Sequence, residues 1–318
     1  MILVHFNISC NIRGTVMLSK NKVKTAVLVL SVVPFLFSGC AFGGNRVFGT
    51  KYDSYKKAGQ YQVGSFDYSV EGIESIDIDW IAGEVILKET KSSSLKVREN
   101  SESLSNSEQV HYLIDGNTLM IKYCESGYIG NIDTKYKNLT VEIPAGISIT
   151  INSVSADIEA EKLTQNEIKA ENVSGSIKIG SLKASDAHID SVSGNINIEN
   201  SYAENTLKFY SVSGKISVAK INSPEIDIES VSGDITAEMT NSAKARITTV
   251  SASIDLTIPK SSGTEIDFST TSGKLSTKLD NTNKNNLYTF AAEKPTDDTD
   301  VKPSRITVDT VSGDLTVK

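Results

Sequence analysis

The stretch Val173–Ile179, with the sequence VSGSIKI, returns nineteen residues later at Val192–Ile198 as VSGNINI. Eight segments of the chain share this core of a β-branched residue, a serine and a small residue. The cores begin at Val154, Val173, Val192, Val212, Val231, Val250, Thr271 and Val311, with spacings of 19, 19, 20, 19, 19, 21 and 40 residues. A fixed period of this length is typical of a repeat architecture in which each unit stacks on its neighbours.

Apolar and polar residues alternate on both sides of each core. Ile168 and Ala170 precede Val173, and Ile177 and Ile179 follow it. This period of two indicates two short strands, each with one buried face, joined by a tight bend. One such unit cannot bury its inner face alone, whereas stacked units can. The sequence therefore predicts an all-β fold, a β-solenoid of coils of about 19–20 residues, over residues 146–318.

The serine of each core is expected to have a structural role. Stacking places these serines on one row, as a ladder: Ser155, Ser174, Ser193, Ser213, Ser232, Ser251, Ser272 and Ser312. We expect their hydroxyls to bond corner backbone groups or neighbouring serines, because catalysis does not need a serine in eight copies. The glycine that follows most of them suits a positive φ or a corner with no room for a side chain. Ala156 and Ala252 occupy the same place, so a positive φ is not obligatory there.

Two regions depart from the regular repeat. The last spacing equals two periods, and we interpret it as one degenerate coil between Leu279 and Lys302, with a polar loop over 280–304. In the N-terminal half, Ile76–Leu87 fits the repeat with Ile81 in the valine place. Further strands are predicted at 95–98, 110–114, 118–123 and 139–143, the last ended by Pro144. We interpret residues 61–145 as a β-meander that caps the solenoid and protects its open edge.

The first 39 residues read as a lipoprotein signal peptide. Lys20, Lys22 and Lys24 precede an apolar run of 13 residues over 25–37, too short to span a bilayer comfortably. The pair Ser38-Gly39 stands directly before Cys40, as in a bacterial lipobox, which makes Cys40 the predicted lipid attachment residue. The alternative is an ordinary secretion signal with a chance cysteine. Residues 1–16 are interpreted as an upstream start extension and residues 40–60 as a tether.

Composition excludes several classes of function. The 318 residues carry a formal charge of −7 with a pI near 5.2, which argues against binding of nucleic acid. Residues 1–39 contain four basic residues and no acid, so their removal leaves a charge of −11. Three Cys and three His give no framework for a disulfide network or a zinc site. We therefore expect no metal and no cofactor.

Candidate catalytic residues are sparse. His188 falls on an outward strand position that other coils fill with Lys, Asp or Arg, and His111 begins a predicted strand with no nucleophile motif nearby.

Outward acids recur two residues before the core valine and three after it: Glu171, Asp190, Glu229 and Asp309, and Asp157, Asp234 and Asp314. Other residues interrupt both rows, so no carboxylate pair is set for glycoside hydrolysis. Weak Ca²⁺ binding by these acids was the alternative to a solvated strand face. Cys124, a lone thiol near a strand end, is expected to be half-buried.

The chain resembles a bacterial "putative adhesin" domain family of unknown function. The resemblance covers roughly residues 55–318 and rests on KAGQYQVG at Lys57–Gly64, IDIDWIAG at Ile76–Gly83, LTVEIP at Leu139–Pro144 and the repeated V-S-G-x-I-x-I. It implies a right-handed β-helical fold and a cell-envelope location, and it transfers no catalytic residue.

These observations lead to a functional hypothesis. The chain is expected to be a non-enzymatic lipoprotein, anchored to the cell membrane on its extracytoplasmic face, that acts as a binding or scaffold surface. Its expected partners are the membrane, through Cys40, and an envelope protein or a cell-wall or surface polymer. The alternative is an accessory regulator in envelope-stress sensing that acts through a membrane partner. A polysaccharide-acting enzyme is the third and least favoured reading.

Overall fold

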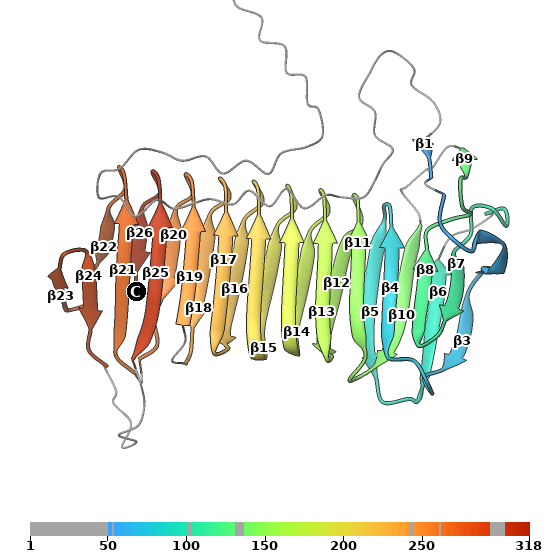
Figure 1. Ribbon diagram of the computed structural model, residues 1–318, viewed down its shortest axis with the longest axis horizontal. Helices are drawn as coiled ribbons and strands as arrows, with labels where there is room; N and C mark the ends of the chain where they lie inside the picture. Colours follow the sequence, from blue (N-terminus) through green and yellow to red (C-terminus); the bar gives the residue numbers. More distant parts are fainter. Residues whose placement is uncertain are drawn as a thin grey trace, which may run out of the picture.

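The computed structural model describes residues 50–52, 54–100, 104–130, 137–241, 244–260, 262–292 and 303–318. The signal peptide, Cys40 and most of the predicted tether lie outside these ranges. In the described residues the only helix is the 3-10 turn η1 (Ala58–Gln60), and strands form almost everything else. Strands stack along one long axis in two facing walls, which confirms the predicted all-β solenoid (Figure 1).

Wall A contains the strands that lead into each corner, and neighbouring coil strands in it pair in parallel. Two long strands belong to both walls: β14 (Ile177–Ser191) and β15 (Ile196–Ser211) run from wall B of one coil into wall A of the next. In stacking order, wall A consists of β8 (Thr118–Lys122), β4 (Ser75–Trp80), β11 (Ser148–Ser153), β13 (Glu167–Asn172), the second halves of β14 and β15, β17 (Glu225–Ser230), β19 (Lys244–Thr249), β25 (Ser304–Thr310) and β21 (Thr264–Thr270).

Wall B contains the strands that follow each corner, also paired in parallel. In stacking order they are β10 (Asn138–Pro144), β5 (Glu84–Thr90), β12 (Asp157–Thr164), the first halves of β14 and β15, β16 (Ile216–Asn222), β18 (Ile235–Met239), β20 (Ile254–Thr257), β26 (Leu315–Val317) and β22 (Leu275–Thr277). A coil is therefore one wall A strand, one corner and one wall B strand.

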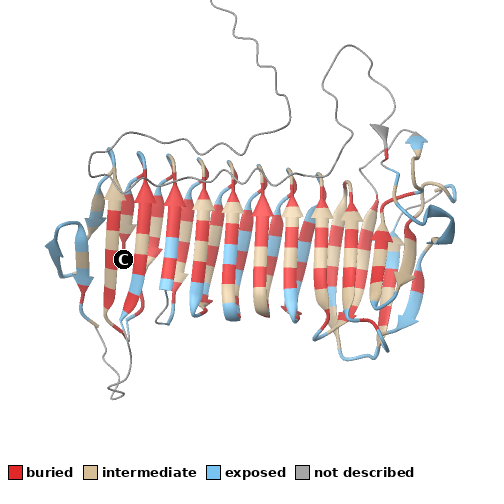
Figure 2. Ribbon diagram, in the orientation of Figure 1, coloured by how far each residue is buried: buried red, intermediate tan, exposed pale blue. Residues whose placement is uncertain are grey.

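The core runs the length of the stack between the two walls. Ile177 and Ile179 are fully buried while Lys178 between them is exposed, and the same alternation marks the other strands (Figure 2). The inward side chains form one continuous cluster from the cap to Val317. Each fully buried Ile or Val contributes about 1.5–3 kcal/mol of hydrophobic stabilisation, so the period-two pattern sets the register of every coil.

The distal end of the stack corrects the prediction of a degenerate coil. The strands β25 and β26 form a complete coil, and this coil lies between β19/β20 and β21/β22 instead of after them. We call residues 304–317 the returning coil, β19/β20 the Val250 coil and β21/β22 the Thr271 coil. The Thr271 coil precedes the returning coil in the sequence but lies beyond it in the stack, so the returning coil occupies the position between the Val250 and Thr271 coils.

The predicted polar loop over 280–304 is in part a β-hairpin. Strands β23 (Asn281–Lys284) and β24 (Leu287–Phe290) pair antiparallel, and β24 pairs antiparallel with β21. The two residues between them, Asn285 and Asn286, adopt φ values of 55° and 66°, the left-handed conformation that a two-residue hairpin turn requires. The hairpin thus closes the wall A edge with a short polar strand, which discourages pairing with another chain.

The other end of the stack is built in a similar way. The strands expected between residues 95 and 143 are present as β6 (Ser94–Asn100), β7 (His111–Asp115), β8 and β10. Only β6, β7, β2 (Gln62–Val63) and β3 (Phe66–Ser69) are antiparallel cap strands, because β8 and β10 belong to a coil. The strands β1 (Thr50–Lys51) and β9 (Ile129–Gly130) form a separate antiparallel pair. Tyr52 is buried against Tyr123, so the predicted tether is already packed onto the cap at this residue.

Candidate functional site

A buried row of polar side chains forms each corner. The residue directly before each core forms this row: Ser153, Asn172, Ser191, Ser211, Ser230, Thr249 and Thr310 are buried, and Thr270, in the last coil of the stack, is partly exposed. Thr310 Oγ1 accepts the backbone N–H of Gly313 at 2.7 Å, and Asn172 Oδ1 accepts that of Gly175 at 2.8 Å. Ser153, Thr249 and Thr270 accept the same turn N–H, so at these five corners the side chain replaces a backbone acceptor. In the described structure the buried hydroxyls of Ser191 and Ser211 have no hydrogen-bond partner. The sequence analysis missed this row, although all eight positions hold Ser, Thr or Asn.

The eight serines predicted as a ladder lie on one exposed row beside this buried one. The hydroxyl of Ser193 donates to the carbonyl of Val173 in the preceding coil at 3.0 Å, and that of Ser155 donates to Ile81 at 3.1 Å. Ser174, Ser213, Ser232, Ser272 and Ser312 make the equivalent bond at 3.2 to 3.5 Å. Ser251 uses its backbone N–H, which donates to Val231 at 3.0 Å. These bonds join neighbouring coils, and none of them joins one serine to another.

Lack of space explains the glycines at the corners of Gly194 and Gly214. A Cβ at Gly194 would lie 1.8 Å from the carbonyl oxygen of Gly175, and one at Gly214 would lie 2.0 Å from that of Gly194. Neither residue has a positive φ, so conformational freedom is not the reason for glycine here. Of the two explanations given by the sequence, close approach of the backbones is the correct one.

The acids three residues after the core valine also join coils. Asp157 Oδ1 accepts the N–H of Ser176 at 2.7 Å, and Asp234 Oδ1 accepts that of Ser253 at 3.0 Å. Along the stack this row reads Asp157, Ser176, Asn195, Lys215, Asp234, Ser253, Asp314, Lys274, so that every second residue is Asp or Asn. Asp314 makes the same bond to Lys274, so all three acids predicted at the corners are engaged in holding the backbone.

The acids of wall A form a partly buried, charged strip. Asp190 is buried and bonds to His188 Nε2 at 2.8 Å through Oδ2, and Lys169 pairs with Glu171 at 2.6 Å. Burial raises the pKa of Asp227, and burial together with the neighbouring Asp227 raises that of Glu229. A solvated face, as the sequence predicted, does not describe these carboxylates. In the same strip Tyr210 lies between Asp190 and Glu229, and Thr248 lies between Glu229 and Asp309.

The cap contains a buried ion pair. Lys137 and Glu99 side chains are about 5% exposed and their charged atoms lie 2.9 Å apart. The ammonium also lies 4.0 Å from the Tyr123 ring centre and donates to the carbonyls of Glu108 and Tyr123. Burial lowers the pKa of Lys137, whereas Glu99 favours its charged form. The carbonyl of Lys137 accepts the indole N–H of Trp80 at 3.2 Å, so this pair fixes the core of the cap.

The remaining candidate residues occupy inert positions. His111 is buried, and its Nδ1 lies 2.9 Å from the carbonyl oxygen of Gln109. Cys124 is fully buried, so the expectation of a half-buried thiol is wrong, and burial raises the pKa of the thiol to about 12. A thiol with so high a pKa stays protonated and is a poor nucleophile.

An open groove of about 820 Å³ lies on wall B where the cap meets the solenoid. The strands β5 and β12 pair only as far as Leu87 and Ala160, after which β5 follows β10 while β12 follows β14. The two strands therefore separate, and the groove lies between them. Glu89 and Lys162 bridge the groove with a 2.6 Å ion pair.

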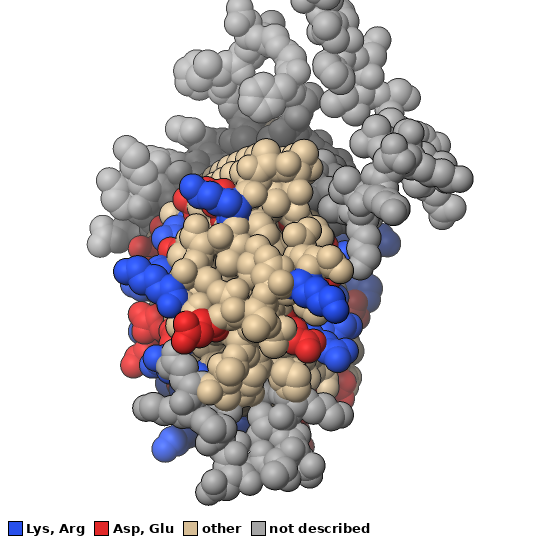
Figure 3. All heavy atoms as spheres, turned by 90° about the vertical axis from the view of Figure 1, so that its left-hand side faces the viewer, with Lys and Arg blue, Asp and Glu red and all other residues tan. Residues whose placement is uncertain are grey.

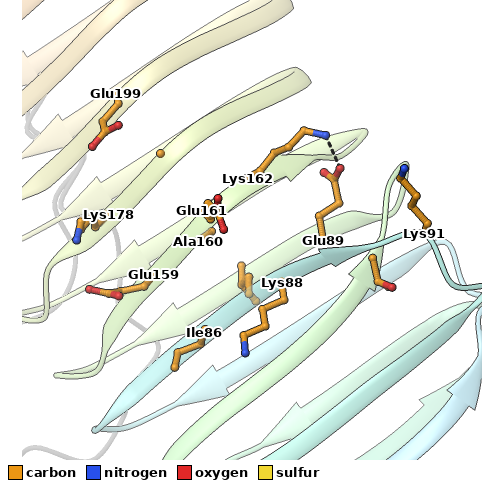
Figure 4. Close-up of a pocket in the computed structure, with 13 residues that line it drawn as sticks. Ile86, Lys88, Glu89, Lys91, Glu159, Ala160, Glu161, Lys162, Lys178 and Glu199 are labelled. Atoms are coloured by element: carbon orange, nitrogen blue, oxygen red, sulfur yellow. Dashed lines mark hydrogen bonds and ion pairs between the residues drawn. The ribbon is translucent and has the colours of Figure 1, made fainter.

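Charges of both signs surround this groove. Figure 4 shows Lys88 and Lys91 on the β5 side and Glu159, Lys178 and Glu199 on the β12 side. Gly180 also lines the groove, where other coils carry side chains such as Glu161 or Glu199. The groove is thus a concave surface that offers ammonium and carboxylate groups from rigid strands. At the distal end, by contrast, charged side chains lie on the two flanks and the middle of the end surface has none (Figure 3).

Within the described ranges, no group of three or more His, Cys, Asp or Glu side chains is arranged to hold a metal ion. None of the helical structure in the described part of the chain has the length and apolar character needed to cross a membrane.

Comparisons with known proteins identify one family model and three similar folds. The model described as Toastrack DUF4097 matches residues 73–318. A "putative adhesin" from Bacteroides fragilis NCTC 9343 has 15% identity over 84% of this chain and 100% of its own, with a TM-score of 0.45. A "putative adhesin" from Parabacteroides merdae ATCC 43184 has 14% identity over 84% of this chain and 100% of its own, with a TM-score of 0.42. A "putative cell adhesion protein" from Clostridium sporogenes ATCC 15579 has 13% identity over 81% of this chain and 99% of its own, with a TM-score of 0.30. No curated protein matches the sequence.

Proposed function

Because the chain belongs to the Toastrack DUF4097 family, we propose that it is a non-enzymatic binding or scaffold protein of the cell envelope, anchored to the membrane by a lipid on Cys40. The family match confirms the resemblance drawn from the repeats and the IDIDWIAG motif. The binding role is the part of this proposal that the structure bears on most directly.

The observation that carries the proposal is the groove between β5 and β12. Lys88 and Lys178 face it together with Glu159 and Glu199, on strands held by the core, and Lys91 faces it from the bend after β5. At the corners the repeated serines and acids are engaged in joining coils. A rigid concave surface with both signs of charge suits a segment that carries both amino and carboxylate groups, such as a peptide of the cell wall or of an envelope protein.

Charge reversal in the groove tests this role. The folded body, residues 41–318, is compared with its Lys88→Glu/Lys178→Glu variant for sedimentation with isolated cell walls and with intact cells. We expect the variant to bind at least about tenfold more weakly, the effect of losing about 1.4 kcal/mol. The control variant Lys208→Glu/Lys215→Glu changes the charge equally at exposed positions away from the groove. Equal binding by both variants, or no binding by the parent protein, would refute the proposal.

The lipid anchor has a separate test. The variant Cys40→Ser removes the thioether position, and we expect the protein to move from the membrane fraction to the soluble fraction. A protein that stays in the membrane fraction would show that the signal is of another kind. This outcome would leave the binding role of the groove unaffected.

A further inference from the structure

The returning coil occupies a slot whose two walls are remote from it in the sequence. On one side β25 pairs with β19 and β26 with β20, and on the other side β25 pairs with β21 and β26 with β22. The hydroxyl of Ser312 bonds to the carbonyl of Val250 across 62 residues. In the middle of the solenoid, by contrast, the wall B strand of one coil continues directly into the wall A strand of the next, as in β14 and β15. The returning coil is joined to neither neighbour in this way.

If the returning coil leaves the slot, the Val250 and Thr271 coils can stack directly on each other. The cores of the Val250 and Thr271 coils are 21 residues apart, close to the 19 or 20 residues that separate directly stacked coils. The connection 258–263 is thus long enough for direct stacking, although here it passes over one coil. In that closed arrangement Gly273 would lie on Ala252, the same place that Gly313 now takes. Release of the returning coil therefore need not leave an open gap in the core.

Two contacts favour the filled slot. Asp314 Oδ1 accepts the N–H of Lys274 at 3.0 Å, which continues the alternating row of acids and amides. In addition, β24 covers the outer edge of β21, an edge that the returning coil would need if it stacked last. The filled arrangement has two coil-to-coil interfaces at this end, and the closed arrangement keeps one of them as a direct contact between the Val250 and Thr271 coils, so both packings are compact.

We propose that this slot is an exchange site that accepts the returning coil of a second copy of the chain, giving a dimer whose two copies exchange residues 304–317. The fit follows from identity, since a second copy supplies the same Ile306, Val308 and Leu315 to the same core positions. Every hydrogen bond of the slot is kept. The segment 291–303 that precedes the coil can span up to roughly 45 Å when extended, which permits a crossover to another copy.

The proposal is independent of the groove and of the lipid anchor. A connection of this length sets an effective concentration of the coil at its own slot of the order of 1 mM. We therefore expect monomers in dilute solution and exchange in concentrated solution, after mild warming has opened the end of the stack.

The ion pair between Lys318 and Asp255 reports on the exchange. Their charged atoms lie 3.3 Å apart across the slot, so a carbodiimide can join them as an amide. Equal amounts of unlabelled and ¹⁵N-labelled protein, residues 41–318, are mixed, warmed at high and at low concentration, cooled, diluted and cross-linked. Mass spectrometry then shows whether the Lys318 and Asp255 peptides in each link carry the same label or different labels. Lys244 and Glu225, 3.2 Å apart on β19 and β17, are the internal control, because these coils are joined directly.

Exchange predicts mixed-label links between Lys318 and Asp255 that increase at least about tenfold from 10 µM to 1 mM protein, as expected for a site that competes with millimolar effective concentration. The Lys244–Glu225 links should keep a single label. Single-label links at both pairs would overturn the proposal. Mixed labels at both pairs would indicate unspecific association and would overturn it too. If Lys318 and Asp255 give no link, light scattering at 1 mM protein replaces the cross-linking, and a protein that is only monomeric overturns the proposal. A dimer supports exchange if the Gly313→Val variant, whose side chain clashes with the carbonyl of Ala252 in the slot, no longer forms it. A dimer that persists in this variant overturns the proposal.

Discussion

Asp314 accepts the backbone N–H of Lys274 at 3.0 Å, although Lys274 comes 40 residues earlier in the chain. The same bond joins Asp157 to Ser176 and Asp234 to Ser253 across only 19 residues. A contact that is local in the middle of the solenoid is thus remote at its distal end, because the returning coil lies inside the stack.

Removal of this carboxylate should loosen the distal end. We expect Asp314→Ala to lower the free energy of unfolding by about 1 kcal/mol, the usual net value of one hydrogen bond. Urea denaturation measures this loss, and hydrogen exchange should speed up at the amide of Lys274. Asn197→Ala, at an exposed position in the first half of β15, is the control. Equal effects of the two substitutions would show that the Asp314 bond contributes nothing.

A methyl group at a corner glycine should destabilise the stack. In Gly194→Ala the new Cβ would lie 1.8 Å from the carbonyl oxygen of Gly175, so the two coils must move apart. We expect a loss of at least about 1–3 kcal/mol, as for overpacked cores. Gly59→Ala adds the same methyl group where no atom lies within 4 Å, and should change stability by less than about 0.5 kcal/mol. Thermal unfolding separates the two; a stable Gly194→Ala protein would contradict the close approach.

The buried ion pair of the cap should be sensitive to the loss of one partner. Lys137→Met leaves Glu99 charged and buried, and we expect it to lower the free energy of unfolding by about 3–5 kcal/mol. The double variant Lys137→Met/Glu99→Leu should recover most of this loss, because no unpaired charge remains. Lys244→Ala breaks an exposed pair and should change stability by less than about 1 kcal/mol. A double variant as unstable as the single one would argue that packing, not charge, explains the loss.

The wall A carboxylates predict a dependence of stability on pH. Burial raises the pKa of Asp227 and of Glu229 in the folded protein, so the folded state holds more protons than the unfolded state over part of the acidic range. The contribution of these groups is therefore present at low pH and is lost as the pH rises from about 4 through the raised values. Relative to the parent, Asp227→Asn/Glu229→Gln should gain stability between pH 4 and pH 7. Chemical denaturation at both pH values measures this; a constant difference would contradict the raised pKa values.

The sequence contained enough information for the regular part of the fold. The alternation at Ile177 and Ile179 predicts which face of each strand is buried, and the period of the cores predicts the stacking. The row before the cores is not apparent from the sequence, because Ser, Thr and Asn are polar residues whose burial depends on the geometry of the turn. Asn172 and Thr249, each three residues before a small residue, carry the signal for the corner caps.

The order of the coils could not come from the period alone, because spacing says how long a coil is and not where it stacks. The row of acids carries more information. Its alternation continues as Ser253, Asp314, Lys274 only if the returning coil lies between its two neighbours, and it breaks if the coils follow the chain. The groove and the pair of Lys137 with Glu99 depend on strands that are remote in the sequence, so no local pattern indicates them.

The position of the returning coil also bears on how quickly the protein folds. Most coils can form as soon as the next 19 or 20 residues are available, because each pairs with the coil just completed. The distal end has to wait until residue 317 has been made, and closing the loop from Val250 to Ser312 costs about 1 kcal/mol more than closing one of 20 residues. Folding should therefore run quickly along the solenoid and end in one slower step. The interval before this step is when the edges of the Val250 and Thr271 coils are exposed to aggregation and proteolysis.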